Sequence, residues 1–531
     1  MEDQSKPEQP LYLQTIIAAY RQKPKLDIGS GIKVSQALST LAHIYEKIRC
    51  AIDYRGEHLF RRVAIERILR RLLNRRNIDT RNVALKLIKE LIWSHYLINE
   101  KVPLEKINQV SEILNKYLSI QESLFALNHI FDKKFELMVA IMANEIDEAL
   151  VDQSVDEAWA VGLSQWFENK YDWIDEINHD VKRILLYIAV RRAFFKSDAA
   201  CIYYHLLIKN VVGWQEGNSA KYPELVIKFK QSLASTEKYL NNRFNNDLFR
   251  FIQKKLPAFQ VFKDIFDQQF EGSEVLINDE QLLWEKVEAI CIQKYRQTNK
   301  KVRQGIINSI IYIFATKMVF AILLEVPYET IRLGRISWLP LSINLVFPPF
   351  LMFLIGLLIH TPGADNTKII YQTILSFIDP KTTDRHAFSL EDKTNHRPNL
   401  IFKTVYLLIL LTVFCSVTYV LWQIGFNVIS GMIFFFFVSL VLLFGLRVRW
   451  AAQELKVIGD KENLFQFLFN LVSLPFLDLG NRLTVGLTRL NVMMIILDFL
   501  IEAPLKIIIS VIGQWTTFIQ QKRDEMIEVP Y

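Results

Sequence analysis

The chain has 531 residues, a formal net charge of +7 and a composition that is 51% hydrophobic, which together exclude a single small domain and allow a large core. Its four cysteines are widely scattered without a Cys-x-x-Cys pair, which disfavours a disulfide framework or a zinc ribbon. The first 25 residues are mostly polar and broken by prolines, so we expect no cleavable signal peptide.

Residues 1–30 are predicted to form a flexible segment that leads into the helical domain. From residue 31 to residue 300, glycine is sparse and Leu, Ile, Lys, Glu and Ala recur at helical spacings, which predicts an all-helical domain. Because no signal peptide is expected, we place this domain in the cytoplasm. Asp79 precedes an apolar-periodic run, and Ser154 is followed three residues later by Glu157, so both positions predict helix starts.

Basic residues are concentrated in Tyr45–Arg76, which holds ten of them and four acidic residues. The candidate contacts to an anionic surface are Arg61, Arg62, Arg67, Arg70 and Arg71. One interpretation is a helix that touches anionic lipid headgroups or an acidic partner, with nucleic acid disfavoured. The other is a surface helix whose Glu66 pairs with Arg62 or Arg70. We favour the second, because the arginines surround most of the helix.

Several runs of this chain are similar to a known family. They are Tyr45–Arg49, Asp53–Arg55, Glu57–Leu59, Arg61-Arg62 and Ala64–Leu69 near the start, and Ile495–Lys506 near the end. These runs resemble an uncharacterised family of multi-span proteins from small-genome bacteria of the candidate phyla. The resemblance covers most of the chain and implies a bacterial membrane protein, without an enzyme signature or an assigned activity.

The stretch Thr404–Leu446 contains 43 residues without an Asp, Glu, Lys, Arg or His. As one helix it would be about 65 Å long, twice the hydrocarbon core of a bilayer. The polar and glycine residues of 422–427 therefore predict a hairpin between two spans. The sequence as a whole predicts a helical membrane domain over residues 301–447, with spans near 305–324, 336–359, 404–422 and 428–446.

Basic residues flank the first and the last predicted span, and the loop 361–403 is polar. Because Lys and Arg are enriched on the cytoplasmic side, we expect the N-terminus and this loop inside and the 422–427 hairpin outside. The expected location is the cytoplasmic membrane of a bacterium. The bilayer, and at the basic segments its anionic headgroups, are the expected lipid contacts.

Two polar residues interrupt the predicted spans. Lys317 lies in the first span, where an ionisable group is costly and indicates a functional site; the alternative is snorkelling to the interface, two turns from Glu325. Asn344 lies one turn before Pro348-Pro349, which predict a kink in the second span. This span is either a broken helix that lines a cavity or, as we favour, a kinked structural helix.

Residues 448–531 predict amphipathic or interfacial helices. The apolar stretch Leu464–Leu479 is short for a span and suits a re-entrant or interfacial helix. Asn491–Ile512 is long enough to span, but it carries a polar stripe at four-residue intervals, formed by Asp498, Glu502 and Lys506. For this second stretch we favour a helix at the interface or docked on the bundle.

The sequence contains no nucleotide-binding, nucleophile-elbow or zinc-protease motif, and we expect no cofactor, metal or catalytic residue. The acidic cluster between Glu145 and Glu157 lacks the spacing of a calcium loop, and we interpret it as a solvated helix end. The tryptophans Trp159, Trp166, Trp173 and Trp214 are expected in a core or at an interface.

The predicted fold is all-α, with a cytoplasmic helical domain before the helical membrane domain. This favours a membrane-anchored scaffold or assembly protein whose cytoplasmic domain binds a protein partner. The alternative is a transporter or channel subunit that uses Lys317 and the proline-containing span, which would require a homo-oligomer. A weaker alternative is a lipid-modifying enzyme that uses Asp498 and Glu502, although no histidine or metal set accompanies them.

Overall fold

The computed structural model describes residues 9–22, 31–34, 60–74, 78–125, 132–173, 178–216, 222–268, 270, 272–334, 337–359, 362–379, 386–388, 400–457 and 464–489. These residues are helical apart from loops and one parallel pair of short strands, β1 (Tyr171–Trp173) and β2 (His386–Phe388). They form two compact units, which divide between Ile252 and Gln253, within the region predicted as one helical domain. We call them the helical unit (residues up to Ile252, with β2) and the membrane unit (the others, up to Arg489).

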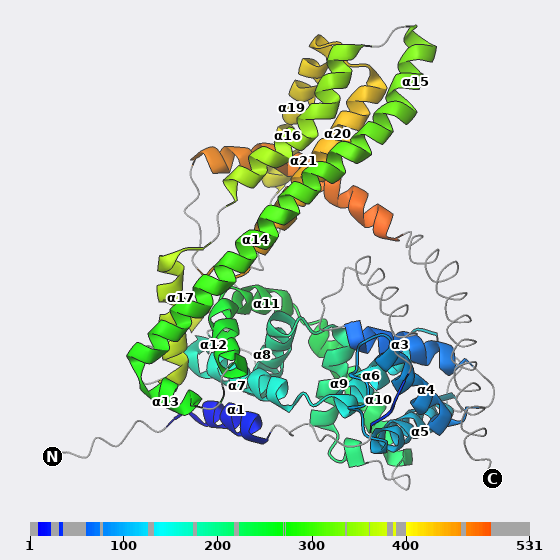
Figure 1. Ribbon diagram of the computed structural model, residues 1–531, viewed down its shortest axis with the longest axis vertical. Coiled ribbons are helices and arrows are strands. Elements are labelled where there is room, and N and C mark those ends of the chain that lie inside the picture. Colours follow the sequence, from blue (N-terminus) through cyan, green and yellow to red (C-terminus); the bar gives the residue numbers. More distant parts are fainter. Residues whose placement is uncertain are drawn as a thin grey trace, which may run out of the picture. The chain divides into compact units, whose positions relative to one another are not determined.

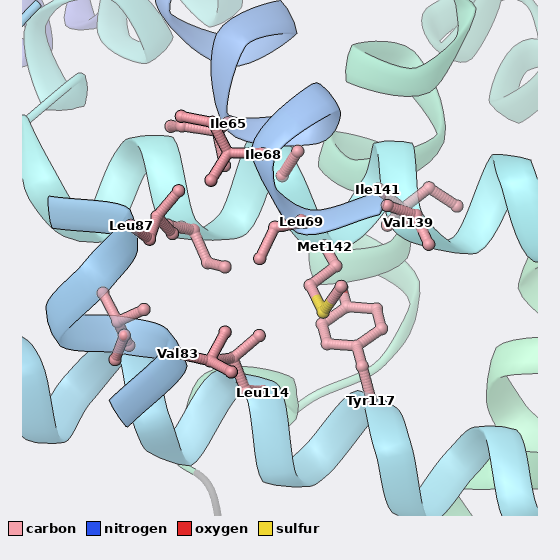
Figure 2. Close-up of a cluster of buried hydrophobic side chains, with 14 of the residues drawn as sticks. Ile65, Ile68, Leu69, Val83, Leu87, Leu114, Tyr117, Val139, Ile141 and Met142 are labelled. Atoms are coloured by element: carbon pink, nitrogen blue, oxygen red, sulfur yellow. The ribbon is translucent and has the colours of Figure 1, made fainter. Parts of the chain in front are cut away.

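The elements of the helical unit are α1 (Leu11–Gln22), α3 (Phe60–Leu72), α4 (Thr80–Trp93), α5 (Glu105–Phe125), α6 (Asp132–Leu150), α7 (Ser154–Lys170), α8 (His179–Phe194), α9 (Ala199–Asn210), the 3-10 turn η2 (Trp214–Glu216), α10 (Tyr222–Leu240) and α11 (Asn245–Gln253) (Figure 1). Leu69, Leu87, Leu114 and Met142 converge from α3, α4, α5 and α6 (Figure 2), and all four are almost fully buried. Their helices carry apolar residues every three or four positions, so each presents one face to this core.

The predicted flexible lead is wrong for Leu11–Gln22, which forms the docked helix α1. Tyr12, Leu13, Ile16 and Ile17 are buried on one face of α1. This face packs on α7, where a Cβ on Gly162 would lie 2.9 Å from Ile16 Cδ1. The three- and four-residue spacing of these apolar side chains outweighs the prolines and polar residues around them.

One of the two predicted helix starts is confirmed. The side chain of Asp79 accepts hydrogen bonds from the backbone N–H groups of Arg81 and Asn82, as an N-cap does. The second start lies where predicted, but Ser154 does not cap α7; its hydroxyl donates to Asp152. Glu157 instead pairs with side chains of α8 and α9.

The membrane unit consists of α12 (Leu256–Gln268), α13 (Ser273–Asn278), α14 (Glu280–Phe320), α15 (Val326–Tyr328), α16 (Trp338–Leu358), α17 (Ala364–Ile378), α19 (Leu400–Gln423), α20 (Val428–Ala452) and α21 (Leu464–Arg489). Four helical stretches are long and apolar enough to cross a membrane, which confirms the predicted set: Glu280–Ile331, Trp338–Leu358, Thr404–Gln423 and Val428–Ala452. Helix α14 runs beside α16 and α20 (Figure 1). Large apolar side chains such as Ile311, Leu357 and Leu408 are exposed on these stretches, as lipid-facing surfaces require.

The first span does not end at Leu324, the predicted boundary. Helical structure continues through two π-helical turns, Ala321–Glu325 and Glu329–Leu333, and reverses at Gly334, whose φ of 66° is favourable for glycine. The prediction ended the span at the first glutamate. Glu325 and Glu329 nevertheless lie inside the bundle, because neighbouring side chains neutralise or hydrogen-bond them.

The predicted hairpin between the last two spans is confirmed. Helix α19 ends at Gln423, Gly425 adopts a φ of 89°, and Asn427 caps α20 through a hydrogen bond from Ser430 N. In the second span, α16 continues through Pro348 and Pro349.

The predicted interfacial stretch Leu464–Leu479 is part of a longer helix, α21, which packs on α20 and α19. Phe476 of α21 lies against Phe414 and Phe435. A Cβ on Gly480 would lie 2.7 Å from the carbonyl oxygen of Ser439, so only glycine allows this approach of α21 to α20.

Candidate functional sites

The first candidate site is a buried charged cluster in the membrane unit. Lys317 Nζ lies 3.1 Å from Glu325 Oε1, and the exposed fractions of the two residues are 0% and 1%. Asn344 Nδ2 donates to the same Oε1 over 2.6 Å and to the Ser430 carbonyl over 3.2 Å. The Lys317 ammonium also lies 4.5 Å from the centre of the Phe437 ring. The cluster therefore joins α14, α16 and α20.

The π-helical turn explains how Lys317 and Glu325 meet. In a regular α-helix, residue i+8 lies about 80° around the axis from residue i. A π turn contains more residues per turn, so it winds less per residue and reduces this offset. The turn Ala321–Glu325 is therefore the local device that brings the carboxylate onto the face of Lys317.

A second carboxylate, Glu329, connects the loop ends of the spans. Its Oε2 accepts a hydrogen bond of 2.7 Å from Ser337 N, just before α16, and its Oε1 accepts one of 2.9 Å from Asn427, the N-cap of α20. Negative charge is favourable at helix N-termini, where backbone N–H groups are unpaired. Glu329 thus stabilises the starts of two helices at once.

The charged cluster is closed to water. Lys317 and Asn344 have no exposed surface, so a water-sized probe does not reach them. Within the described residues, Glu325 Oε2 and Asn344 Oδ1 have no hydrogen-bond partner. An ammonium, a carboxylate and unpaired acceptors are thus held together away from water, which is where proton or ion handling occurs in membrane proteins. Snorkelling, the alternative for Lys317, is not what the structure shows.

The second candidate site is a cavity of about 700 Å³ in the helical unit. It lies among α5, α6, α7, α9 and η2. Its charged and polar lining consists of Gln109, Glu112, Lys116, Glu145, Glu148, Asp152, Gln153, Ser154, Glu157, Tyr204, His205, Lys209 and Gln215. Glu112 and Asp152 are exposed, so the cavity reaches the surface of the unit.

Glu145 is fully paired on one wall of this cavity. It forms an ion pair with Lys116, and its Oε2 accepts 2.8 Å hydrogen bonds from Tyr117 and from the Trp214 indole. Lys116 also donates to the Trp214 carbonyl over 2.9 Å. All four side chains are buried. This set satisfies its own charges and serves as a rigid wall.

Glu157 is paired at another part of the cavity lining. Tyr187 donates to both of its carboxylate oxygens, at 2.9 and 2.8 Å, and Lys209 Nζ lies 3.1 Å from Oε1. Arg191 Nη1 is 3.5 Å from Oε2. Burial, and with it the neighbouring Glu157 carboxylate, raises the pKa of the Tyr187 hydroxyl well above its usual value, so it remains a donor.

Glu148 differs from the other two buried glutamates, because no Lys or Arg of the described residues lies in ion-pair distance of it. Its Oε2 accepts a 3.1 Å hydrogen bond from Tyr204, and its Oε1 lies 3.4 Å from His205 Nε2. Burial raises the pKa of Glu148 from 4.5 to about 7, and burial lowers the pKa of His205 well below its usual value. Glu148 therefore titrates near neutral pH beside a neutral imidazole.

The interpretation of the acidic cluster as a solvated helix end is wrong. Glu145 and Asp147 are buried, and Glu148 and Glu157 line the cavity. These four residues lie at helical spacing on α6 and at the start of α7, so they point to shared neighbours, whereas Asp152 between the two helices is exposed. Three of the four tryptophans, Trp159, Trp166 and Trp214, are buried as expected; the side chain of Trp173 lies outside the described residues.

The arginines predicted to contact an anionic surface are mostly engaged within the chain. Glu66 pairs with both Arg62 and Arg70, which is the salt-bridge arrangement we favoured. Arg61 pairs with Asp147, and Arg71 pairs with Glu90. Arg67 is half-buried on α3. The predicted stripe Asp498, Glu502 and Lys506 lies outside the described residues, so the lipid-modifying alternative stays a prediction.

Sequence reasoning singled out Lys317 and Asn344 but missed Glu325, Glu329, Glu148 and His205. Of these four residues, only Glu325 could have been recognised from the sequence. It lies eight residues after Lys317 and before any turn residue. Among the described residues, no group of three or more His, Cys, Asp or Glu side chains is arranged to hold a metal ion.

The fold and the two sites describe an α-helical membrane protein with a separate helical unit that carries a polar cavity. Comparisons with protein-family models, curated proteins and solved structures find no match to this chain.

Proposed function

We propose that this chain is a membrane-anchored interaction protein whose helical unit binds a partner in its polar cavity. The contrast between the two sites supports this proposal. In the membrane unit, Lys317 and Glu325 are paired and closed off from water. In the helical unit, Glu148 and its neighbours line a cavity that reaches the surface at Glu112 and Asp152. Accessible polar groups in a concave site are the usual mark of binding.

The anchor, in this proposal, is the set of four spans in the cytoplasmic membrane of a bacterium, with the helical unit in the cytoplasm. The basic flanks of the spans support this orientation, and the resemblance to a bacterial membrane family supports the choice of membrane. Single cysteines on a cysteine-free background test it with an impermeant maleimide on whole cells. Labelling of Thr330→Cys and Gln423→Cys, with Lys368→Cys labelled only after permeabilisation, is expected; the reverse pattern would refute the orientation.

A photo-cross-linking amino acid tests the binding role. We place it at Gln109, which lines the cavity, and for comparison at Ile227, an exposed residue of α10 outside the lining. We expect a defined protein adduct at Gln109 that disappears when Ala149→Trp fills the cavity, with α-helical content and melting unchanged. Adducts that are the same at both positions, or that persist in Ala149→Trp, would refute cavity binding.

A second function, transport by a homo-oligomer, is favoured by one observation. Glu325 Oε2 and Asn344 Oδ1 have no partner among the described residues, although they lie beside a buried ammonium at a π-helical turn. Transport would require a conformation that opens this cluster to water. Proteoliposomes that hold a pH gradient test it: unchanged proton leak in Lys317→Met against the unmodified chain would remove this candidate.

A further inference from the structure

We propose that the membrane unit binds one anionic phospholipid, with a segment of an acyl chain in a groove between α16, α20 and α21 and with its phosphate at Arg449. Helix α20 packs on both α16 and α21 (Figure 1), and residues of all three helices line the groove. Ile355 of α16, Leu442 of α20 and Phe469 of α21 belong to this lining. The site goes beyond the proposed function, because it does not depend on the cavity of the helical unit.

The groove is fixed by the way the helices pack. On α20, its lining residues are Leu442, Gly445, Leu446 and Arg449. These positions follow the spacing of a helix, so the residues lie on one side of α20. A Cβ on Gly445 would lie 2.8 Å from Ile355 Cγ2. The glycine therefore lets α16 approach α20 closely, which sets the two helices beside the groove.

The groove opens to the lipid-facing surface of the bundle. Leu358 lines it and is 45% exposed on α16, one of the helices that are apolar enough to span a membrane. Ser473, a polar residue of the lining, is buried, and its hydroxyl donates to the backbone carbonyl of Asn470 over 3.1 Å. An apolar groove in this place meets hydrocarbon instead of water, so acyl chains are the molecules that reach it.

The size of the groove suits part of one acyl chain. Its volume is about 70 Å³, which corresponds to about five water-sized groups. A helix of another protein is about 10 Å across and does not enter such a space. A flexible hydrocarbon chain can place a few methylene groups in the groove and leave the rest in the bilayer. We therefore assign the groove to a lipid chain.

Arg449 gives the groove a positive charge. Among the described residues that line the groove, it is the only charged one. It lies three positions before Ala452, the last residue of α20, and its neighbour Trp450 is 66% exposed. Arginine and exposed tryptophan at the end of a span are typical of the membrane interface, where the phosphate groups of lipids lie. Arg449 is therefore at the right depth to meet a phosphate.

The chemistry of the lining favours an anionic headgroup. A guanidinium can donate two parallel hydrogen bonds to a phosphate. Asn470, which is half-buried in the same lining, carries amide N–H donors for phosphate or ester oxygens. No carboxylate belongs to the described lining, so the ammonium group of a zwitterionic lipid would have no counter-ion there. Phosphatidylglycerol, which has a phosphate and no ammonium group, matches this site.

Native mass spectrometry of the full chain, released from detergent micelles, provides the test. The probes are phosphatidylglycerol and phosphatidylethanolamine with identical acyl chains. We expect the first phosphatidylglycerol to bind about tenfold more tightly than phosphatidylethanolamine, because only the latter brings an ammonium group to a positive site. Equal affinities of the two lipids would overturn the assignment of an anionic lipid.

The role of Arg449 is tested against a neighbouring arginine. Arg449→Gln should weaken phosphatidylglycerol binding about tenfold and remove the preference between the two lipids. Arg447→Gln is the matched control, because Arg447 is exposed on the same helix and lies outside the lining. It should bind as the unmodified chain does. An equal loss in both variants would mean general attraction to the basic end of α20 and would overturn the site.

The role of the groove is tested with two adjacent leucines. Leu358→Trp should weaken the binding of both lipids about fivefold, because the indole takes the place of the acyl chain. Leu357→Trp is the matched control, since Leu357 is 61% exposed and lies outside the lining. Both variants should keep the α-helical content and melting of the unmodified chain. Full affinity in Leu358→Trp would show that the lipid does not use the groove.

Soluble phosphate compounds separate the headgroup from the acyl chain. Glycerophosphoglycerol, which is the headgroup without acyl chains, and inorganic phosphate are added in large excess before the measurement. Neither should displace phosphatidylglycerol, because neither fills the apolar part of the site. Displacement by either compound would assign the site to a soluble phosphate and overturn the lipid.

Discussion

Asn344 Nδ2 and Lys317 Nζ converge on one atom, Glu325 Oε1, at 2.6 and 3.1 Å. The amide comes from α16 and the ammonium from α14, so a single carboxylate oxygen links two of the spans. Removal of either charged member leaves the other charge buried without its counter-ion.

We therefore predict that Lys317→Met destabilises the membrane unit by about 3–5 kcal/mol, because it leaves the Glu325 carboxylate unpaired in an apolar bundle. The double variant Lys317→Met/Glu325→Gln should recover most of this loss. Unfolding in mixed micelles by titration with a denaturing detergent measures both. A double variant as unstable as Lys317→Met would show that the ion pair is not the cause.

The second prediction concerns the pH dependence of the helical unit. The pKa of Glu148 is raised from 4.5 to about 7 on folding, so the folded state binds more protons between these values. Its stabilising contribution is present below about pH 4.5 and is lost as the pH rises through about 7.

Glu148→Gln should accordingly gain about 2 kcal/mol relative to the unmodified chain between pH 5 and pH 8. Chemical denaturation followed by tryptophan fluorescence gives this difference, and Glu136→Gln is the control on the same helix. A difference that does not change with pH would mean that Glu148 ionises normally. The comparison between variants also cancels the opposite contribution of His205, which must stay neutral in the folded unit.

The third prediction separates two arginines of α3. The Arg62 side chain is 3% exposed and pairs with Glu66 and with Asp198, the N-cap of α9. Arg62→Met should cost about 2–3 kcal/mol, since it removes a buried guanidinium whose charged hydrogen bonds join α3 to the start of α9, although Glu66 keeps its pair with Arg70. Arg71 is 39% exposed, and Arg71→Met should cost at most about 1 kcal/mol. Equal losses in chemical denaturation would contradict this assignment.

The fourth prediction tests the contact between α20 and α21. Gly480→Leu should separate the two helices, because its side chain would meet the backbone of Ser439. Gly431→Leu is the matched control, since nothing lies within 4 Å of a Cβ there. A cysteine pair replacing Phe435 and Phe476, on a cysteine-free background, reports the contact by cross-linking. The cross-link should be lost in Gly480→Leu only; its retention would refute the packing.

Features that follow from local chemistry could be predicted from the sequence. The uncharged run Thr404–Leu446 could only be two spans, and the glycine at 425 with Asn427 fixed the position of the hairpin. Asp79 could be identified as a cap because an N-cap bonds to residues two and three positions on. These signals lie within a few residues of the feature that they predict.

Features that depend on distant partners could not be predicted. Glu325 is a charged residue at the edge of an apolar run, and without Asn344 and Lys317 in place the sequence pattern favours a loop. Glu148 and His205 are 57 positions apart and on different helices, and neither belongs to a motif. The cavity exists because α6 and α9 pack together, which composition and periodicity do not specify.

The placement of Lys317 and Glu325 on one continuous helical stretch bears on how the chain enters the bilayer. A charged residue in the middle of a span costs about 2.5–3.5 kcal/mol on insertion scales. Here the compensating carboxylate is synthesised only eight residues later and needs no other segment to reach the lysine. Lys317 can therefore leave the insertion machinery already paired with its carboxylate, before the second span supplies Asn344. During synthesis, Lys317 therefore gains its counter-ion, Glu325, first, and Glu325 gains its hydrogen-bond donor, Asn344, second.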